Sequence, residues 1–173
     1  MLNTFGKDII PTNDEERLEV LHSYKIVGSQ PEVFFNNLAH IMADCFKTPI
    51  ALISLVDKEQ VFFKANVGMK DNYVPRGISL CSLAVLDPLP TVFTDALKEP
   101  CLLSNPLVAG EFGLRFYAGA PITTPDGYHI GTVCIVDKQP RNFSAIDEDL
   151  LVGFADAAME AFLKRKQSID AGS

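Results

Sequence analysis

Two pairs of strand-like runs constrain the fold of this chain more than any other feature of its sequence. Ile50–Val56 is apolar throughout, and Gln60–Val67, which follows after a short turn, alternates between apolar and more polar residues. Residues 114–123 and His129–Asp137 form the second pair, joined by the turn sequence Pro125-Asp126-Gly127. Strands that follow one another without helices between them predict hairpins. We therefore expect an α+β fold with a central antiparallel β-sheet of five to six strands, not a Rossmann fold.

Three capping-box sequences predict where the longer helices begin. In such a box, a Ser or Thr accepts a hydrogen bond from the backbone three residues on, and an acidic residue there reaches back. The pattern occurs three times ahead of residues with helical apolar spacing, at Thr12 and Glu15, at Ser29 and Glu32, and at Ser144 and Asp147. We expect these terminal helices to lie together on one face of the sheet.

The middle of the chain is expected to cover the opposite face. Residues 68–77 show no periodicity and predict a loop, and a short apolar helix containing Cys81 should follow. Residues 91–96 predict a further strand, and residues 97–113 an irregular segment with a short helix. Because the strands of the second hairpin are apolar on both faces, each face needs a cover. The terminal helices cover one face, so only the middle segment remains to cover the other.

Length and charge narrow the class of protein. A chain of 173 residues fits one domain, which we place at residues 11–167, with an N-terminal extension at 1–10 and a tail at 168–173. The net charge of −7, without a basic stripe, argues against nucleic acid and anionic membrane as partners. No apolar run reaches the roughly 18 residues of a membrane span, and residues 1–10 lack the apolar stretch expected of a signal peptide. We therefore expect a cytoplasmic protein.

Catalytic and metal-binding motifs are absent from the sequence. The cysteines, Cys45, Cys81, Cys101 and Cys134, form no C-x-x-C pair, so a zinc ribbon is not indicated. Such scattered cysteines are usually small buried apolar residues. The sequence also lacks nucleophile-elbow, zinc-protease, Walker and dinucleotide-binding motifs. We expect a protein that is not an enzyme, and no cofactor is identified.

Six ordered blocks of sequence span most of the chain: Glu16-Arg17-Leu18 with Leu21 and Tyr24; Pro49 to Asp57; Phe62-Phe63-Lys64 with Gly68; Pro75-Arg76 with Cys81; Arg115-Phe116-Tyr117-Ala118-Gly119-Ala120-Pro121 with Asp126-Gly127, Ile130-Gly131-Thr132 and Asp137; and Pro140-Arg141. Together these blocks resemble a GAF domain, of the group found in bacterial diguanylate cyclases and sensor histidine kinases. The resemblance implies a small-molecule pocket between the sheet and the middle segment. It also implies a sensory or dimerising role in signal transduction.

The residues expected to line this pocket come from the sheet and from the middle segment: Phe62, Lys64, Arg76, Cys81, Asp95, Arg115 and Tyr117. Arg115 and Tyr117 share one face of their strand, where an Arg can bind an anionic ligand. In the alternative interpretation, Arg115 pairs with a carboxylate such as Asp95 and holds the cover in place. Phe62 and Lys64 either line the pocket or face solvent at a sheet edge.

Four further interpretations follow from the resemblance. Cys81 precedes Ser82, whereas bilin-binding GAF domains have Cys followed by His, so we expect a packed thiol there. The cyclic-nucleotide signature is not matched around Asn105 and Phe112. A thiol-based redox enzyme or sensor like free-methionine sulfoxide reductase, using Cys81 and Cys101, stays open as an alternative, and so does a structural dimerisation domain without ligand.

Partners are expected from the same resemblance. The first and last helices can pair with those of a second copy, which predicts a homodimer. We expect no kinase, cyclase or DNA-binding segment after Ser173. We therefore expect the chain to regulate a partner, such as a sensor kinase or diguanylate cyclase, or to be a fragment of a longer sensor. An unidentified small molecule is the expected ligand.

Overall fold

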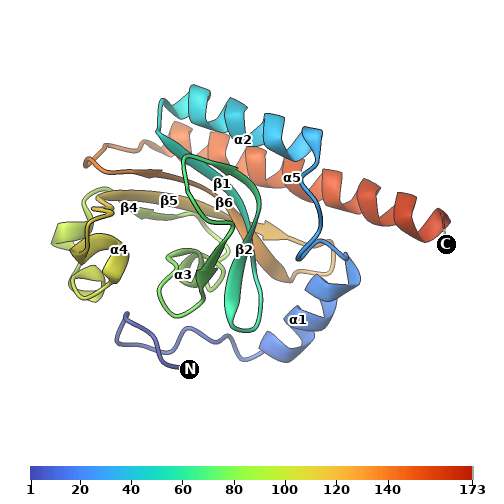
Figure 1. Cartoon of the computed structure of the whole chain (residues 1–173), viewed down its shortest axis with the longest axis horizontal. Coiled ribbons are helices and arrows are strands. Elements are labelled where there is room, and N and C mark those ends of the chain that lie inside the picture. The colour runs from blue at the N-terminus through green and yellow to red at the C-terminus, as the bar shows by residue number, and fades with distance from the viewer. Residues whose placement is uncertain (173) are drawn as a thin grey trace.

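A six-stranded antiparallel sheet forms the centre of the molecule (Figure 1). The structure, a computed structural model, describes residues 1–172. The strands lie in the order β3-β2-β1-β6-β5-β4. Their bounds are Ile50–Val56 for β1, Gln60–Val67 for β2, Tyr73–Pro75 for β3, Thr91–Phe93 for β4, Phe116–Thr123 for β5 and His129–Asp137 for β6. The predicted α+β fold is confirmed.

Two long helices cover one face of the sheet. Helices α2 (Val33–Phe46) and α5 (Ala145–Ala171) run side by side across it, as Figure 1 shows. Phe35 of α2 stacks on Phe162 of α5 with ring centroids 4.6 Å apart. Ala118 and Ala120 of β5 are fully buried on this face, where their small side chains let the helices approach closely. Helix α1 (Asp14–Ser23) lies apart from this pair, near the end of the sheet.

Short elements cover the other face. They are helix α3 (Cys81–Ala84), the 3-10 turns Ala96–Lys98 and Pro100–Leu102, and helix α4 (Pro106–Ala109). The first ten residues join this layer, since Phe5 and Ile9 are buried among its apolar side chains. Asn105 ties the two together, because its amide nitrogen donates to Thr4 Oγ1 at 2.9 Å and to the Ile78 carbonyl at 2.8 Å. We call residues 68–115 the cover segment.

The predicted strands agree closely with the observed ones at β1, β2 and β6. The predicted loop at 68–77 contains the short strand β3, which pairs with β2, and the strand predicted at 91–96 ends at Phe93. A three-residue strand shows too little alternation to be recognised in a sequence.

The capping-box predictions have mixed outcomes. Ser144 and Asp147 form a complete box at the start of α5. The boxes at Thr12 and Ser29 are wrong, since α1 and α2 have no side-chain cap. Ser29 and Glu32 bind the Lys64 ammonium group instead. A charged partner from a distant strand thus outcompetes the local backbone N–H groups.

Gly131 of β6 generates the first prediction. A Cβ at this position would collide with the Ser54 carbonyl and the Leu55 Cα of β1, which are backbone atoms that cannot move aside. Gly131→Ala should therefore lower the free energy of unfolding by about 1–3 kcal/mol, as overpacking does. Gly153→Ala on the exposed face of α5, where a Cβ meets nothing within 4 Å, is the matched control and should stabilise the protein by about 0.5–1 kcal/mol. Urea unfolding measures both; equal effects would contradict the close approach of β6 to β1.

Candidate functional site

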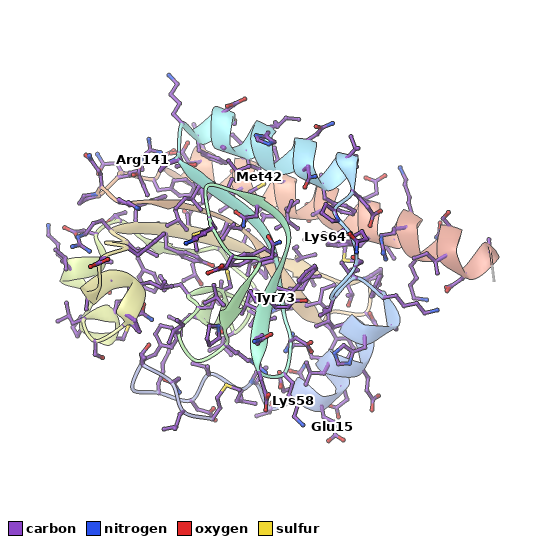
Figure 2. The ribbon with its side chains drawn as sticks, viewed as in Figure 1. Glu15, Met42, Lys58, Lys64, Tyr73 and Arg141 are labelled. Atoms are coloured by element: carbon purple, nitrogen blue, oxygen red, sulfur yellow. The ribbon has the colours of Figure 1, made fainter. Side chains whose placement is uncertain are left out.

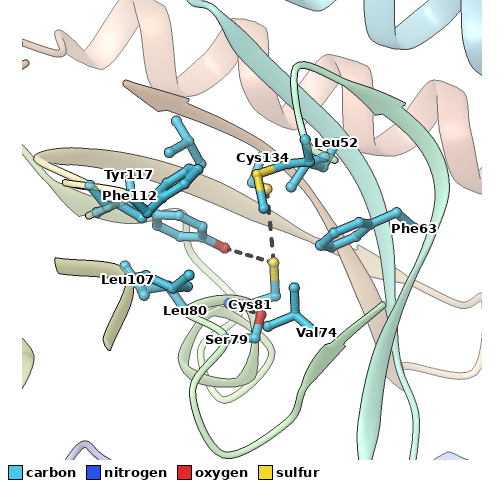
Figure 3. A pocket seen from close by; sticks show the side chains of 13 residues that line it. Leu52, Phe63, Val74, Ser79, Leu80, Cys81, Leu107, Phe112, Tyr117 and Cys134 are labelled. Carbon is cyan, nitrogen blue, oxygen red and sulfur yellow. Dashed lines mark hydrogen bonds between the residues drawn. The ribbon is translucent and has the colours of Figure 1, made fainter. Parts of the chain in front are cut away.

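A small apolar cavity lies between the sheet and the cover segment (Figure 3). Its volume is about 30 Å³. The strands provide one wall through Leu52 and Phe63, and the cover provides the other through Leu80, Leu107 and Phe112. In the described part of the chain no Lys, Arg, His, Asp or Glu lines it. The site is therefore suited to a small, largely uncharged molecule.

Two sulfurs, the Tyr117 phenol and Ser79 form the polar part of the cavity wall. The Cys81 Sγ lies 3.8 Å from the Cys134 Sγ, and the Tyr117 hydroxyl donates a hydrogen bond to Cys81 Sγ at 3.4 Å, as Figure 3 shows. Ser54 and Thr132 hydroxyls are hydrogen-bonded to each other at 2.8 Å and are also fully buried. These groups come from α3, β6, β5 and β1, so the fold brings together residues far apart in the sequence.

The hydrogen bonds around Cys81 distribute protons unequally between the two thiols. The hydrogen bond with Cys134, together with those of Ser54, Thr132 and Tyr117, outweighs burial and lowers the pKa of Cys81 to about 6. The same bond, together with burial, raises the pKa of Cys134 well above its usual value. Burial, reinforced by the neighbouring sulfurs, also raises the pKa of Tyr117. Cys81 therefore has the lower pKa of the two thiols and is the one favoured as a thiolate, while the raised pKa values of Cys134 and Tyr117 favour their protonated forms.

Of the residues predicted to line a pocket, Cys81 and Tyr117 line this cavity. Arg115 does not pair with Asp95 in the described part of the chain. Its guanidinium donates to the carbonyls of Val108 at 3.0 Å and Leu114 at 2.9 Å, and so holds the cover segment without a carboxylate. Asp95 accepts a hydrogen bond from the Leu97 backbone N–H and begins a 3-10 turn.

Phe62 and Lys64 face the helix layer and not the central cavity. Phe62 packs in the cluster formed with α2, and the Lys64 side chain is fully buried beside it. The Lys64 ammonium donates to Ser29 Oγ at 2.8 Å, to the Gln30 carbonyl at 2.6 Å and to the Glu32 carboxylate. Both residues line a separate cleft of about 280 Å³ at the edge of the sheet. Figure 2 shows Lys64 near the segment that leads into α2.

Arg76 lies outside the cavity as well. Its guanidinium forms two hydrogen bonds with the Asp14 carboxylate, at 3.0 and 2.8 Å, and Arg17 binds the same carboxylate at 2.9 Å. Both arginines are 1% exposed. Burial raises the pKa of Asp14, but the hydrogen bonds from the two arginines outweigh it and keep that pKa below its usual value. This cluster fastens α1 to the cover segment.

Sequence reasoning missed Cys134, Phe63 and most of the apolar lining. The hairpin register offers a signal for part of it, since Tyr117 pairs with Val136 and Gly119 with Cys134, which places these side chains near one another. The residues of the cover segment carry no such signal, because irregular backbone has no periodicity to read.

Comparison with known proteins agrees with this architecture. The model of the GAF domain family matches residues 30–162. The chain belongs to the GAF domain family. The resemblance found in the sequence is thereby confirmed, and a sensory or regulatory role in signalling fits the relatives of this GAF domain.

A cyclic di-GMP phosphodiesterase of Pseudomonas aeruginosa is 32% identical over 150 residues, which cover 86% of this chain and 26% of the relative. The chain thus spans about a quarter of the length of the curated relative it matches. A domain of a two-component sensor histidine kinase from Sinorhizobium meliloti has a TM-score of 0.65 at 15% identity, covering 81% of this chain and 96% of its own.

Free methionine-R-sulfoxide reductase from Neisseria meningitidis has a TM-score of 0.65 at 19% identity, covering 97% of this chain and 98% of its own. At this identity, the likeness concerns the fold. Residues 1–172 contain no group of three or more His, Cys, Asp or Glu side chains placed to hold a metal ion. Within the same residues, no helix is both long and apolar enough to cross a membrane.

The Lys64–Glu32 pair generates a prediction about pH. Burial raises the pKa of Glu32, but hydrogen bonds from Lys64 and Arg165 outweigh it, so the net pKa is lowered. A lowered carboxyl pKa stabilises the fold above the unfolded value of about 4.3, and this stability is lost as the pH falls through the folded value. Glu32→Gln should therefore cost about 1–2 kcal/mol at pH 7, given the partial exposure of Glu32, and progressively less below about pH 4.

Urea unfolding from pH 7 to pH 3 measures this difference. Glu19→Gln on the exposed side of α1, where no ion pair is formed in the described part of the chain, is the matched control and should change stability little at any pH. A Glu32→Gln cost that does not shrink in acid would contradict the charged pair.

Proposed function

We propose that this GAF domain is a regulatory input domain that binds a small, largely apolar ligand in its central cavity. The observation that supports this most directly is the wall composition: apolar side chains surround a few polar atoms, the Tyr117 hydroxyl, Ser79 and two sulfurs. Small-molecule sites have this character, with few polar groups that fix orientation. Regulation, not catalysis, is the role we propose, inside the cytoplasm.

The size of the cavity suggests how ligand binding would produce a signal. A volume of about 30 Å³ is far below the roughly 300 Å³ of a typical ligand site. A metabolite can therefore enter only if the cover segment moves away from the sheet. Leu107 of α4 and Phe112 in the turn that follows it are the residues that must be displaced. Binding and cover movement would then be one coupled event.

The relatives suggest the pathway. The 32% identical relative is named as a cyclic di-GMP phosphodiesterase, and a structural neighbour belongs to a two-component sensor kinase. We propose that the chain regulates such an output, either as part of a longer sensor or through a partner kinase or cyclase.

Leu107 allows a test of the cavity. Leu107→Phe adds volume to the wall and should weaken binding of indole and toluene, used as small apolar probes, by about tenfold, or roughly 1.4 kcal/mol. Leu103→Phe, a matched change at a half-exposed position of the same segment, should leave binding unchanged. Calorimetric titration measures both, and native mass spectrometry of the purified protein shows whether a ligand is already bound. Equal affinities in the two variants would place the ligand elsewhere.

The outer surface of the helix layer supports a homodimer. Phe34 and Ile41 of α2 are 53% and 55% exposed, and Ile146 and Leu150 of α5 are 79% and 42% exposed. A groove between the two helices is lined by Phe34, by two alanines of α5 and by the oppositely charged Glu160 and Lys164. A surface that carries positive, negative and apolar side chains can be complementary to the same surface of a second copy related by a two-fold axis. We therefore propose pairing through α2 and α5, and not through α1.

Charge introduced on this surface tests the dimer. Ile41→Asp with Leu150→Asp should convert the dimer to a monomer, because each carboxylate would be buried without a partner. Leu97→Asp with Leu103→Asp, at positions of the cover segment that are each 52% exposed, is the matched control and should leave the dimer intact. Sedimentation velocity measures the mass. A monomeric unmodified protein at high concentration would refute the proposal.

A further inference from the structure

The cavity holds a pair of thiols placed for oxidation by a small molecule. Cys81 is 3% exposed and Cys134 is fully buried, and their sulfurs lie 3.8 Å apart. The S–S bond of a disulfide is about 2.05 Å long, so only a small approach of the two sulfurs is needed for the bond to form. Cys81 begins the four-residue helix α3, whereas Cys134 lies in the central strand β6. A bond between them would join the cover segment to a central strand of the sheet.

The surroundings assign different roles to the two sulfurs. The Tyr117 hydroxyl donates a hydrogen bond to Cys81, whose sulfur also shares a hydrogen bond with the Cys134 sulfur, and hydrogen bonds accepted by a sulfur stabilise its thiolate. The thiolate is the nucleophilic form of cysteine. Cys134 keeps its proton and has Cys81 as its neighbour, which is the arrangement of a resolving thiol beside an attacking one.

The dimensions of the cavity select the oxidant. One water molecule needs about 10–15 Å³, so a cavity of about 30 Å³ admits a molecule of two heavy atoms. Hydrogen peroxide has that size. Glutathione disulfide and other bulky oxidants do not fit while the cover is closed.

We propose that hydrogen peroxide oxidises Cys81 and Cys134 to a disulfide that locks the cover segment onto the sheet. In the first step the Cys81 sulfur attacks one peroxide oxygen. An S–O bond forms and the O–O bond breaks; the oxygen bound to sulfur keeps its hydrogen as the sulfenic acid, and the departing hydroxide takes up the one proton released from Cys81 to leave as water. In the second step the Cys134 sulfur attacks the Cys81 sulfenic acid, the S–O bond breaks, and hydroxide leaves as water with the Cys134 proton. Two thiols and one peroxide become one disulfide and two waters.

The disulfide would act on the ligand site described above, and this consequence rests on the proposed function. Since a ligand enters only when the cover moves away from the sheet, a covalent link from α3 to β6 would close the cavity to metabolites. The same cover that responds to a ligand would then also respond to peroxide. Formation of the disulfide itself does not depend on any ligand.

The test uses a protein in which only the two cavity thiols remain. Cys45 is exposed and Cys101 is partly buried, so Cys45→Ser with Cys101→Ser removes the competing thiols. After peroxide treatment, denaturation and alkylation, this protein should lose both reactive thiols and two hydrogen masses. A peptide cross-linked between Cys81 and Cys134 should appear, and dithiothreitol should reverse the change. Glutathione disulfide should leave both thiols free.

Single substitutions in this background separate the roles of the two thiols. With Cys134→Ser, Cys81 should stop at the sulfenic acid and be trapped by dimedone. With Cys81→Ser, Cys134 should react roughly tenfold more slowly or not at all, since it lacks thiolate character. Circular dichroism checks that each variant folds. Where a serine substitution disturbs the fold, alanine is introduced at the same position instead.

Hydrogen exchange tests independently whether the disulfide holds the cover segment on the sheet. Backbone exchange in α3 should slow about tenfold in the oxidised protein relative to the reduced one, because opening of the cover would be prevented. Retention of both thiols under peroxide, equal reactivity of Cys134 without Cys81, or glutathione attached to Cys81 would each overturn the proposal. Cross-linking without any binding of indole or toluene to the reduced protein would uphold the dithiol and refute the proposed ligand site.

Discussion

The central strands are apolar on both faces, and the rest of the structure follows from this constraint. Strands β1, β6 and β5 are almost entirely buried, so the sheet cannot leave either side to solvent. One side is covered by α2 and α5, whose lengths of 14 and 27 residues give a continuous layer. The other side is covered by elements of three or four residues. The two covers therefore differ in how readily they can move, because short elements contribute few cooperative contacts.

Buried ion pairs fasten the N-terminal segments onto this sheet. Asp14 is bound by two arginines, one of them Arg76 from the cover segment, and the Lys64 ammonium is enclosed by residues just before α2. Burying a charge without its partner destabilises the fold, so each cluster fixes its segment in one position. Its contribution to the net stability is smaller, because burying both charges also costs free energy. The cover is thus anchored to α1 by Arg76, whereas the Arg115 guanidinium, at the other end of the segment, binds carbonyl oxygens of the segment itself. Between these two arginines lie α3 and α4, which contact the cavity.

The sequence predicted the sheet well and the site only in part, and the difference has a physical cause. Alternation and turn residues are local signals, so β1, β2 and β6 were predicted with their observed bounds. Partnerships between distant charges have no local signal. Ser29 and Glu32 have the spacing of a capping box, yet they bind Lys64 because an enclosed ammonium group needs acceptors more than a helix end that water can reach. For the same reason, the sequence singled out Cys81 but not Cys134, which lies 53 positions away along the chain and 3.8 Å away in space.

Strand β5 connects the cover segment on one face of the sheet with the helix layer on the other. Tyr117 contacts Cys81 of the cover through its hydroxyl, while its neighbours on β5, Phe116 and Ala118, pack against the helix layer. A displacement of the cover that moves Tyr117 therefore acts on the same strand that supports α5. The helix layer is also the surface proposed for pairing with a second copy. A ligand or oxidation can switch the cover segment between two states. Where β5 prefers a different arrangement in each state, the same switch also changes the preferred arrangement of α5.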